Sequence, residues 1–530
     1  MSSSGSNAGL VVVGAKTGRA SDVLSPGALA LLARLHDAFA APRRALLERR
    51  AERQRLFDAG EMPDFPAETA AIRAAEWRVA DIPAEFLDRR VEIAGPPDRS
   101  AMAAALQSGA RTFMADFEDA SSPSWANLID GQANLMDLWA GRLPAAGGRG
   151  TCDPRLGPAV MMRPRGWHMP ENHVRIDGEP IAAALFDMGL YLFHNAAAIL
   201  AQGRAPGVYL PKIEGYLEAR LWNDVLTRIE RELGLPDGTV KATALIETLP
   251  AAFEMDEILW ELRGRATALN CGRWDLIFSF IKRLGRHARF VTPDRASMVM
   301  GSNFLSSCSY LLIKTCHRRG ALALGGKAAH LPVDGDAAAH KLAIEKVRAD
   351  KQRAVLEGLD GAWVSHPDLV PVAAAVFDKV MPAANQLGQL HDDMEILRDD
   401  MLSMHPGRRT EAGLRNNVRV AVRYLAEWLS GRGAVPLYNL MEDAGTAEIA
   451  RIQLWQWVYH RASLSDGRKI TPELFSETLE EETARLLAET GPDAYASGRY
   501  AEAVALLRDM TLAEDAPEFL TLSAYALLAA

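Results

Sequence analysis

The sequence predicts an α/β protein: a (β/α)8 TIM barrel with an N-terminal helical segment and a C-terminal helical domain. The middle of the chain contains eight short β-branched and apolar runs, most of them separated by enough chain for a helical crossover. Eight such units within about 280 residues match this barrel. Polar residues follow directly after the runs, and the carboxyl ends of the strands are where this fold carries its chemistry.

The candidate strands lie at 90–93, 112–115, 159–162, 207–211, 242–246, 266–270, 321–324 and 361–365. A doubly wound open sheet is the main alternative, but no GxGxxG sequence opens a helix here. Gly325-Gly326-Lys327 has the wrong glycine spacing for a phosphate loop, and Ala328 stands where that loop needs Ser or Thr. The pattern therefore favours the barrel.

The two flanking regions have helical rather than strand periodicity. We expect an N-terminal helical clasp over 1–88, the barrel over 89–375, a linker region over 376–408 and a C-terminal helical plug over 409–530. Apolar residues recur at helical spacing within 28–55. Pro42 lies inside that segment and predicts a break or kink there, because proline removes a helical hydrogen bond.

Composition narrows the class of protein. The chain has 530 residues, 48% of them apolar, and a formal net charge of −9, which argues against non-specific nucleic-acid binding and against an anionic membrane surface. No apolar run approaches the roughly 20 residues of a membrane span. Four cysteines without a CxxC pair indicate reduced thiols, and no secretory leader or peroxisomal signal is recognised. We expect a cytoplasmic protein.

The most informative stretch is 241–284, which reads as strand, helix, strand. Glu247 ends the first strand and Asp275 follows the second, so the two carboxylates are expected on neighbouring strands. Carboxylates with open positions for water and substrate oxygens suit Mg2+ better than zinc. The alternative is that each acid is neutralised in an ion pair, for example with Arg163 or Arg273. Spacing alone leaves both interpretations open.

Long motifs then connect the chain to a known family. They are MADFEDASSPSWANLIDGQANL at 114–135, MRPRGWHMPENHVRIDGEPI at 162–181, YLPKIEGYLEARLWNDV at 209–225, LIETLPAAFEMDEIL at 245–259, LNCGRWDLIFSFIK at 269–282, LLIKTCHRRGALALGG at 311–326 and PLYNLMEDAGTAEIARIQLWQWVYH at 436–460. The chain closely resembles malate synthase of the shorter, isoform A type, and the resemblance covers nearly its whole length.

The resemblance implies a Mg2+-dependent Claisen condensation of acetyl-CoA with glyoxylate, followed by hydrolysis of malyl-CoA to malate and CoA. It assigns the general base to Asp443 and the stabilisation of the enolate oxygen to Arg163. It assigns the Mg2+ ligands to Glu247 and Asp275. The remaining implied contacts are to the glyoxylate carboxylate, from the loop Gly272, Arg273 and Trp274.

The implied base lies beyond the eighth strand, so the C-terminal plug is expected to close over the barrel mouth. Spacing alone favoured a different role for Asp443, as a cap of the helix that follows, with Thr446 as another cap. Pro367, together with Trp363, lies at the eighth strand end and is expected to line the CoA or glyoxylate pocket, although core packing explains both residues equally well.

Several residues keep two interpretations. Asp116, Glu118 and Asp119 follow the second strand and either hold metal-bound waters or orient Arg163, or else form a structural cluster with Arg165 or Lys212. Lys327 and His330 depart from the family pattern, which usually has apolar or amide residues there, and are expected to affect CoA contacts only.

Two other functions remain open at this stage. One is a related acyl-CoA lyase of the citrate lyase β-subunit-like type, and the other is a non-catalytic binding protein on a barrel scaffold. The expected partners are acetyl-CoA and glyoxylate, without nucleic acid or membrane. The oligomeric state is left open.

Overall fold

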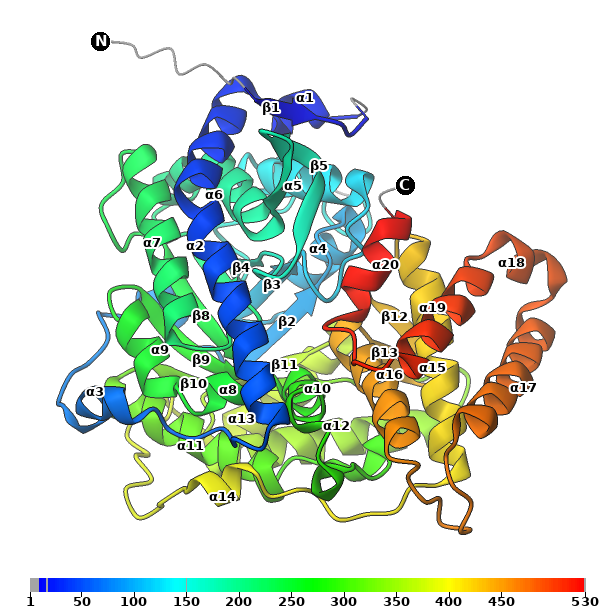
Figure 1. The fold of residues 1–530 in the computed structure, drawn as a ribbon. Coiled ribbons are helices and arrows are strands. Elements are labelled where there is room, and N and C mark those ends of the chain that lie inside the picture. The colour runs from blue at the N-terminus through cyan, green and yellow to red at the C-terminus, as the bar shows by residue number, and fades with distance from the viewer. Residues whose placement is uncertain (1–8, 16–17, 149, 529–530) are drawn as a thin grey trace.

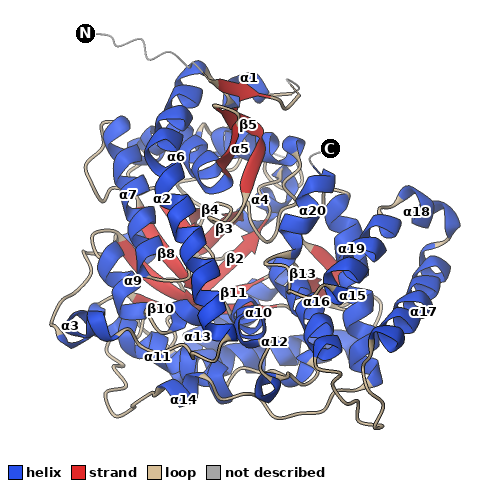
Figure 2. Ribbon diagram, viewed as in Figure 1, coloured by secondary structure: helices blue, strands red, loops and turns tan. Residues whose placement is uncertain are grey.

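The computed structural model describes residues 9–15, 18–148 and 150–528 and contains a closed barrel of eight parallel strands (Figures 1 and 2). The strands are β2 (Val91–Gly95), β3 (Thr112–Asp116), β4 (Ala159–Arg163), β7 (Gly207–Leu210), β8 (Lys241–Ile246), β9 (Ala266–Cys271), β10 (Leu322–Ala328) and β11 (Gly361–Val364). They close in the order β10-β11-β2-β3-β4-β7-β8-β9. All eight predicted strands and the predicted fold class are confirmed.

Strand β10 shows the largest difference from prediction, because it continues past residue 324 to Ala328. Its pairing with β11 shifts register between Gly325 and Ala328. A bulge of this kind bends a strand and re-aims its side chains. After the shift Ala328 still pairs with Val364 of β11, and the residues that follow β10 meet the C-terminal domain, where His330 pairs with Leu440.

Helices surround the barrel. They are α4 (Arg99–Leu106), α5 (Trp125–Trp139), α6 (Ala183–Ala201), α7 (Tyr216–Glu232), α8 (Leu249–Ala252), α9 (Met255–Leu262), α10 (Arg273–Leu284), α11 (Asn303–Arg319), α12 (Ala337–Glu357) and α13 (Val370–Val380). A small sheet of β1 (Leu10–Val12), β5 (Pro170–Ile176) and β6 (Glu179–Ala182) stands beside them. Short 3-10 turns lie at Ala67–Thr69, Ala84–Phe86, Ala288–Phe290, Arg295–Ser297 and Pro367–Leu369.

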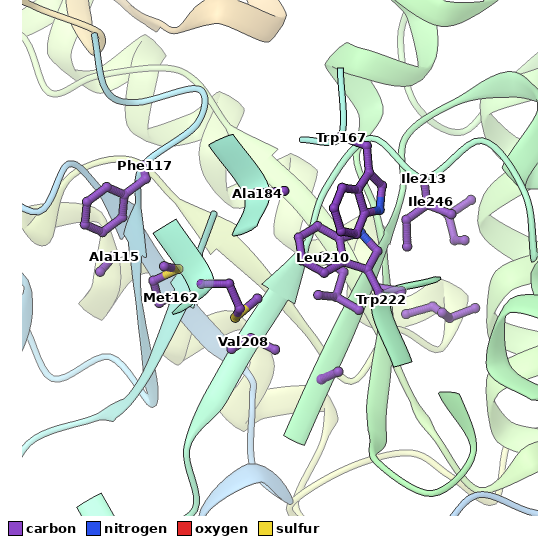
Figure 3. Packing of buried hydrophobic residues seen from close by; sticks show 14 of the residues in the cluster. Ala115, Phe117, Met162, Trp167, Ala184, Val208, Leu210, Ile213, Trp222 and Ile246 are labelled. Atoms are coloured by element: carbon purple, nitrogen blue, oxygen red, sulfur yellow. The ribbon is translucent and has the colours of Figure 1, made fainter. Parts of the chain in front are cut away.

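Strand side chains alternate between two packed layers. Val208 and Leu210 of β7 belong to the large cluster between strands and helices, together with Met162 and Ile246 (Figure 3). Tyr209, between them in sequence, points the other way and meets Trp363 of β11, 5.3 Å between ring centroids. Strands β7 and β11 are not neighbours in the barrel, so this contact crosses its interior. The period of two along each strand thus separates the interior from the helical layer.

The N-terminal segment comprises α1 (Ala20–Val23), α2 (Pro26–Asp58) and α3 (Ala70–Ala74). The predicted break at Pro42 is wrong, because α2 continues through it as one helix. Figure 1 shows α2, in dark blue, running along α6 and α7 and reaching α10. Packing along this length offsets the lost hydrogen bond at the proline, as tertiary contacts often override local propensity.

The C-terminal part is helical, as predicted. It comprises α14 (Arg398–Met401), α15 (Glu411–Leu429), α16 (Ala444–Tyr459), α17 (Pro472–Thr490), α18 (Pro492–Ser497), α19 (Tyr500–Leu512) and α20 (Leu520–Leu528), with a hairpin of β12 (Val435–Leu437) and β13 (Leu440–Glu442). These helices share a hydrophobic core of their own, and α16 packs against α10 of the barrel. The predicted domain limits stay predictions; α13 extends past the expected barrel end at 375.

Helix α6 corrects one expectation. It is long and apolar enough to cross a membrane by length and composition, although no such segment was expected. Most of it is buried within the protein, where it packs against α2 and α5. An apolar helix enclosed in this way has the character of a core helix.

Candidate active site

Arg163 ends β4 and is held by Asp116 at the end of the neighbouring β3. Register places the two residues opposite each other in the parallel pair. The guanidinium donates from Nε to Asp116 Oδ1 (2.7 Å) and from Nη2 to Oδ2 (2.5 Å), and both side chains are buried. Burial lowers the pKa of Arg163, but the charges of Asp116 and Asp119 outweigh this and hold its pKa well above the ordinary value. Arg163 is a fixed, oriented positive charge.

Asp116 is itself fixed by the loop after β3. Its two oxygens accept the backbone N–H groups of Glu118 (2.9 Å) and Ala120 (2.8 Å). The sequence left open whether the acids of this loop orient Arg163 or form a structural cluster. Asp116 orients Arg163, and Asp119 also pairs with Arg163 Nη1 at 3.0 Å. Glu118 and Asp119 bind Lys212 at 3.2 and 3.0 Å, so Asp119 contacts both cations.

Glu247 and Asp275 lie close together, and Asp119 completes a group of three carboxylates. One oxygen from each lies within 4.8 Å of the others, and all three residues are buried. Glu247 directly follows β8, and Asp275 lies in the first turn of α10. The sequence predicted Asp119 as a holder of metal-bound waters, as a group that orients Arg163 or as part of a structural cluster with Arg165 or Lys212, but not as a member of the metal group itself. The acidic run Asp-Phe-Glu-Asp at 116–119, directly after a strand, was the signal for it.

Lys212, after β7, neutralises part of this cluster. Its Nζ lies 3.0 Å from Asp119, 3.0 Å from Asp275 and 3.4 Å from Glu247. The ion-pair alternative named the wrong cations, since among the described residues Glu247 and Asp275 form ion pairs with Lys212 and not with Arg163 or Arg273. Arg165 pairs elsewhere, with Asp187 and Glu171.

The electrostatics of the cluster fit a bound cation. Burial raises the pKa of Glu247 and Asp275 against the pull of Lys212, while Lys212 and Arg163 overcome burial and lower the pKa of Asp119 to about 2. Asp275 Oδ1 is buried and lies 3.0 Å from Lys212 Nζ. Three buried carboxylates supply the hard oxygen ligands that suit Mg2+.

The loop at 272–274 forms the start of α10 beside these acids. A side chain at Gly272 would place its Cβ 2.6 Å from Glu247 Cβ, so only glycine permits this approach. The Arg273 guanidinium turns away from the acids, toward Asp350 (3.4 Å) and the Lys327 carbonyl (3.3 Å). Trp274 Nε1 donates to the same carbonyl (3.3 Å). The free N–H groups of the first helical turn are left for an anion.

Asp443 is the N-cap of α16. Its Oδ1 accepts the Thr446 N–H (3.1 Å), and Thr446 Oγ1 accepts the Asp443 N–H (2.9 Å). The predicted capping role of Asp443 is therefore present, with Thr446 as its partner. The other oxygen, Oδ2, pairs with Lys327 Nζ. Gly445 lets α16 approach the metal cluster, since a Cβ there would lie 2.6 Å from Asp275 Oδ2.

One cavity of about 220 Å3 joins these groups. It is lined by residues from the barrel and from the C-terminal domain, including Arg163, Glu247, Gly272, Arg273, Trp274, Asp275, Lys327, Trp363, Pro367 and Asp443. All residues predicted for catalysis, substrate and metal thus border the same space. Asp443 and Arg163 are 280 positions apart in sequence, and only the domain packing brings them together.

Comparisons with known families cover most of the chain. Residues 8–71 match the malate synthase N-terminal domain, residues 159–404 the malate synthase TIM barrel domain and residues 408–528 the malate synthase C-terminal domain. The chain belongs to the malate synthase family. It is 51% identical to malate synthase of Myxococcus xanthus (strain DK1622), over 98% of this chain and 96% of that protein.

Two further relatives support the same family assignment. Glyoxysomal malate synthase of Zea mays is 48% identical over 96% of this chain and 93% of its own length. Malate synthase A of Escherichia coli (strain K12) is 45% identical over 96% of each chain. The predicted malate synthase, an acyltransferase, is confirmed at the level of the family, and these relatives do not support the lyase alternative.

Three features of the site escaped sequence reasoning. Lys212 was considered only as a structural partner and Lys327 only as a contact for CoA. Asp119 was considered as a holder of waters, as a group that orients Arg163 or as a structural acid, but not as a metal ligand. Lys212 and Lys327 instead pair with the metal cluster and with Asp443. Positive charges scattered along a chain carry no signal of which acids they will face once it folds.

Proposed function

We propose that this enzyme condenses acetyl-CoA with glyoxylate and hydrolyses the malyl-CoA thioester to malate and CoA, with Asp443 as base and Arg163 as enolate stabiliser. The observation that carries the proposal is the shared cavity. Arg163 enters it from the barrel, Asp443 from the C-terminal domain, and the acids Glu247 and Asp275 form its floor beside the start of α10.

Deprotonation of the acetyl methyl group is the difficult step, since a thioester methyl is a very weak acid. Asp443 takes the proton, and negative charge develops on the thioester oxygen. Arg163 is aimed by Asp116 and keeps its proton at neutral pH, so it stabilises that oxygen without moving. Preorganised donors of this kind contribute about 3–4 kcal/mol to a barrier in a site that excludes water.

Asp119, Glu247 and Asp275 would hold the divalent cation, which we propose to be Mg2+. When bound, this ion supplies a Lewis acid for the aldehyde oxygen of glyoxylate. The start of α10 offers the N–H groups of Arg273 and Trp274 to the glyoxylate carboxylate, whereas the Gly272 N–H donates to the Ile246 carbonyl (3.1 Å) and anchors the loop to β8. The aldehyde carbon would then face the methyl group held between Arg163 and Asp443.

The acetyl arm is proposed to enter along the side of the cavity formed by the end of β2 and by α4. Ile93, Gly95 and Pro96 line this side, with Ala434 of the C-terminal domain opposite them. Trp363 and Pro367 close the same space from β11. The Arg163 guanidinium lies 5.7 Å from the Trp363 ring centroid, so this tryptophan also supports the catalytic cation.

A cytoplasmic location is proposed together with this activity. All four cysteines are free and buried, which agrees with a reducing compartment. The net charge of −9 supports partners that are small molecules rather than nucleic acid or membrane.

The testing experiment is a thiol-release assay with acetyl-CoA, glyoxylate and Mg2+, in which each component is omitted in turn. The expected result is release of CoA that requires all three, with malate formed in equal amount. A lyase would cleave malyl-CoA into acetyl-CoA and glyoxylate without net thiol release, and that outcome would overturn the proposal. Arg163→Lys should lose most of the rate, because an ammonium cannot reproduce the bidentate contact with Asp116.

A further inference from the structure

Lys327 is a buried cation that reaches from the barrel to the C-terminal domain. It lies in the part of β10 beyond the predicted strand end, and only 8% of its side chain is exposed. Its Nζ pairs with Asp443 Oδ2 and lies 3.4 Å from the Met441 carbonyl oxygen. Both contacts are to the segment that directly precedes α16, so the ammonium group binds the end of that segment.

The backbone around Lys327 is fixed on both sides. Its carbonyl accepts hydrogen bonds from Arg273 Nη2 and Trp274 Nε1, both at 3.3 Å, which ties it to the start of α10. Beyond it, the Ala329 carbonyl accepts the Met441 N–H at 2.8 Å. His330 bridges Leu440, and the Asn439 carbonyl accepts the Leu331 N–H at 3.0 Å. The tail of β10 therefore docks along β13, immediately before Asp443.

Asp443 has one designated partner for each carboxylate oxygen. Oδ1 accepts the Thr446 N–H as a helix cap, and Oδ2 meets Lys327 Nζ. A carboxylate held at both oxygens cannot rotate about its Cβ–Cγ bond without losing a contact. The second lone pair of Oδ2 is left to accept a proton from a substrate in the cavity.

Negative charges surround this carboxylate. Asp119 and Asp443 are both among the charges that raise the pKa of Asp275, so the three carboxylates repel one another. Lys327 is the cation facing Asp443 directly and also acts on Asp119. Without it, repulsion from the metal cluster would push the Asp443 carboxylate away from the cavity floor.

We propose that Lys327 is a positioning residue that holds the base Asp443 in its working orientation across the interface between the barrel and the C-terminal domain. The inference rests on the proposed role of Asp443 and goes beyond it, because it assigns to the barrel the orientation of a base that the other domain carries. It also gives a function to a lysine at a position where the sequence departs from the family pattern.

The experiment compares steady-state thiol release by the full chain and by Lys327→Met, Lys327→Arg and Lys341→Met, with acetyl-CoA and with methyl-trideuterated acetyl-CoA. Methionine keeps the length of the side chain and removes its charge, whereas arginine keeps the charge. Lys341 is the matched control, since its side chain is 77% exposed on α12 and makes only a 3.9 Å contact with Glu345. Melting temperatures establish that each variant is folded.

We expect Lys327→Met to lower kcat by about tenfold or more while the KM values for acetyl-CoA and glyoxylate stay within about threefold. The deuterium isotope effect on kcat should be at least as large as in the wild type, because proton abstraction is the impaired step. Lys327→Arg should recover most of kcat, and Lys341→Met should match the wild type. If Lys327→Met does not fold, Lys327→Gln takes its place with the same expectations.

The inference is overturned if Lys327→Met keeps kcat within about twofold, if its isotope effect disappears, or if Lys327→Arg is no better than Lys327→Met. These outcomes are read against turnover by the wild type and by Lys341→Met. Absence of thiol release in those two proteins would instead overturn the proposed function, so the two failures are distinct.

Discussion

Mg2+ should stabilise the folded protein measurably, because six carboxyl groups gather around three cations at the mouth of the barrel. The acids are Asp116, Glu118, Asp119, Glu247, Asp275 and Asp443, and the cations are Arg163, Lys212 and Lys327. A ligand that binds only the folded state adds about 2.7 kcal/mol at a concentration 100 times its dissociation constant. Melting shifts of about 2–4 °C per kcal/mol in domains of 150–250 residues, and smaller ones in longer chains, predict a rise on the order of 3–5 °C.

Protons should leave the site as the metal enters. Burial raises the pKa of Glu247 and Asp275, so the metal-free cluster retains protons at pH values where exposed acids have lost theirs. Metal coordination needs the carboxylate form. Mg2+ affinity should therefore fall as the pH is lowered, and binding heats measured in buffers of different ionisation enthalpy should reveal proton release.

Thermal melting of the chelator-treated protein, with and without saturating Mg2+, is the assay. Glu247→Gln and Asp275→Asn should abolish the Mg2+-dependent rise, whereas Glu480→Gln, an exposed acid of α17, should retain it. Equal melting temperatures with and without Mg2+ would refute the reasoning, and so would a full shift in Glu247→Gln.

Three further outcomes are expected. Asp443→Asn should lower kcat by about 10^3-fold or more, and near-normal turnover would contradict the assignment of the base. Asparagine keeps the cap on the Thr446 N–H but leaves the buried Lys327 without its carboxylate, so the melting temperature should also fall. Asp116→Asn should lower kcat by about 10^2-fold, since Arg163 loses its charged bidentate partner, and an unchanged thiol-release rate would show that the pair does not orient the guanidinium. Glu254→Gln should change the pH dependence of stability, because burial raises the pKa of Glu254 from about 4.5 to about 7. The stability that the protonated Glu254 carboxyl gives the folded state is complete below pH 4.5 and is lost as pH rises through 7. Denaturant unfolding at pH 5 and at pH 8.5 should then show a relative gain of about 2.5 kcal/mol in unfolding free energy for the variant at the higher pH. The same change in unfolding free energy between the two pH values in both proteins would contradict this.

The barrel was predictable from local patterns. Runs such as Ala242–Ile246 are buried on both faces, so they consist of apolar and β-branched residues whatever their neighbours are. Glu247 follows such a run directly, and its place at a strand end already marked it as a ligand candidate. Pro42 shows the limit of local rules, because α2 gains enough packing along the barrel to continue through it.

Helix α6 shows a second limit of local rules, because its apolar composition alone does not say whether it lies in a membrane or in a protein core. The composition of α6 alone is compatible with a membrane span, and only its enclosure by other helices identifies it as part of the core. Apolar side chains leave water equally well in lipid and in a protein interior, so composition cannot distinguish the two.

By itself, the sequence determined the order of the elements, the fold class, the family and the acids at the strand ends, because periodicity and motif are local properties of a chain. The tertiary structure decided which charges meet. Lys327 and Asp443 are 116 positions apart, and their contact exists only because the bulged end of β10 docks against β13. Asp119, Lys212 and Asp275 come from three different strand–helix units and meet because parallel strands bring their carboxyl ends to one mouth. Electrostatic energy depends on distance in space, and closure of the barrel and docking of the C-terminal domain set those distances.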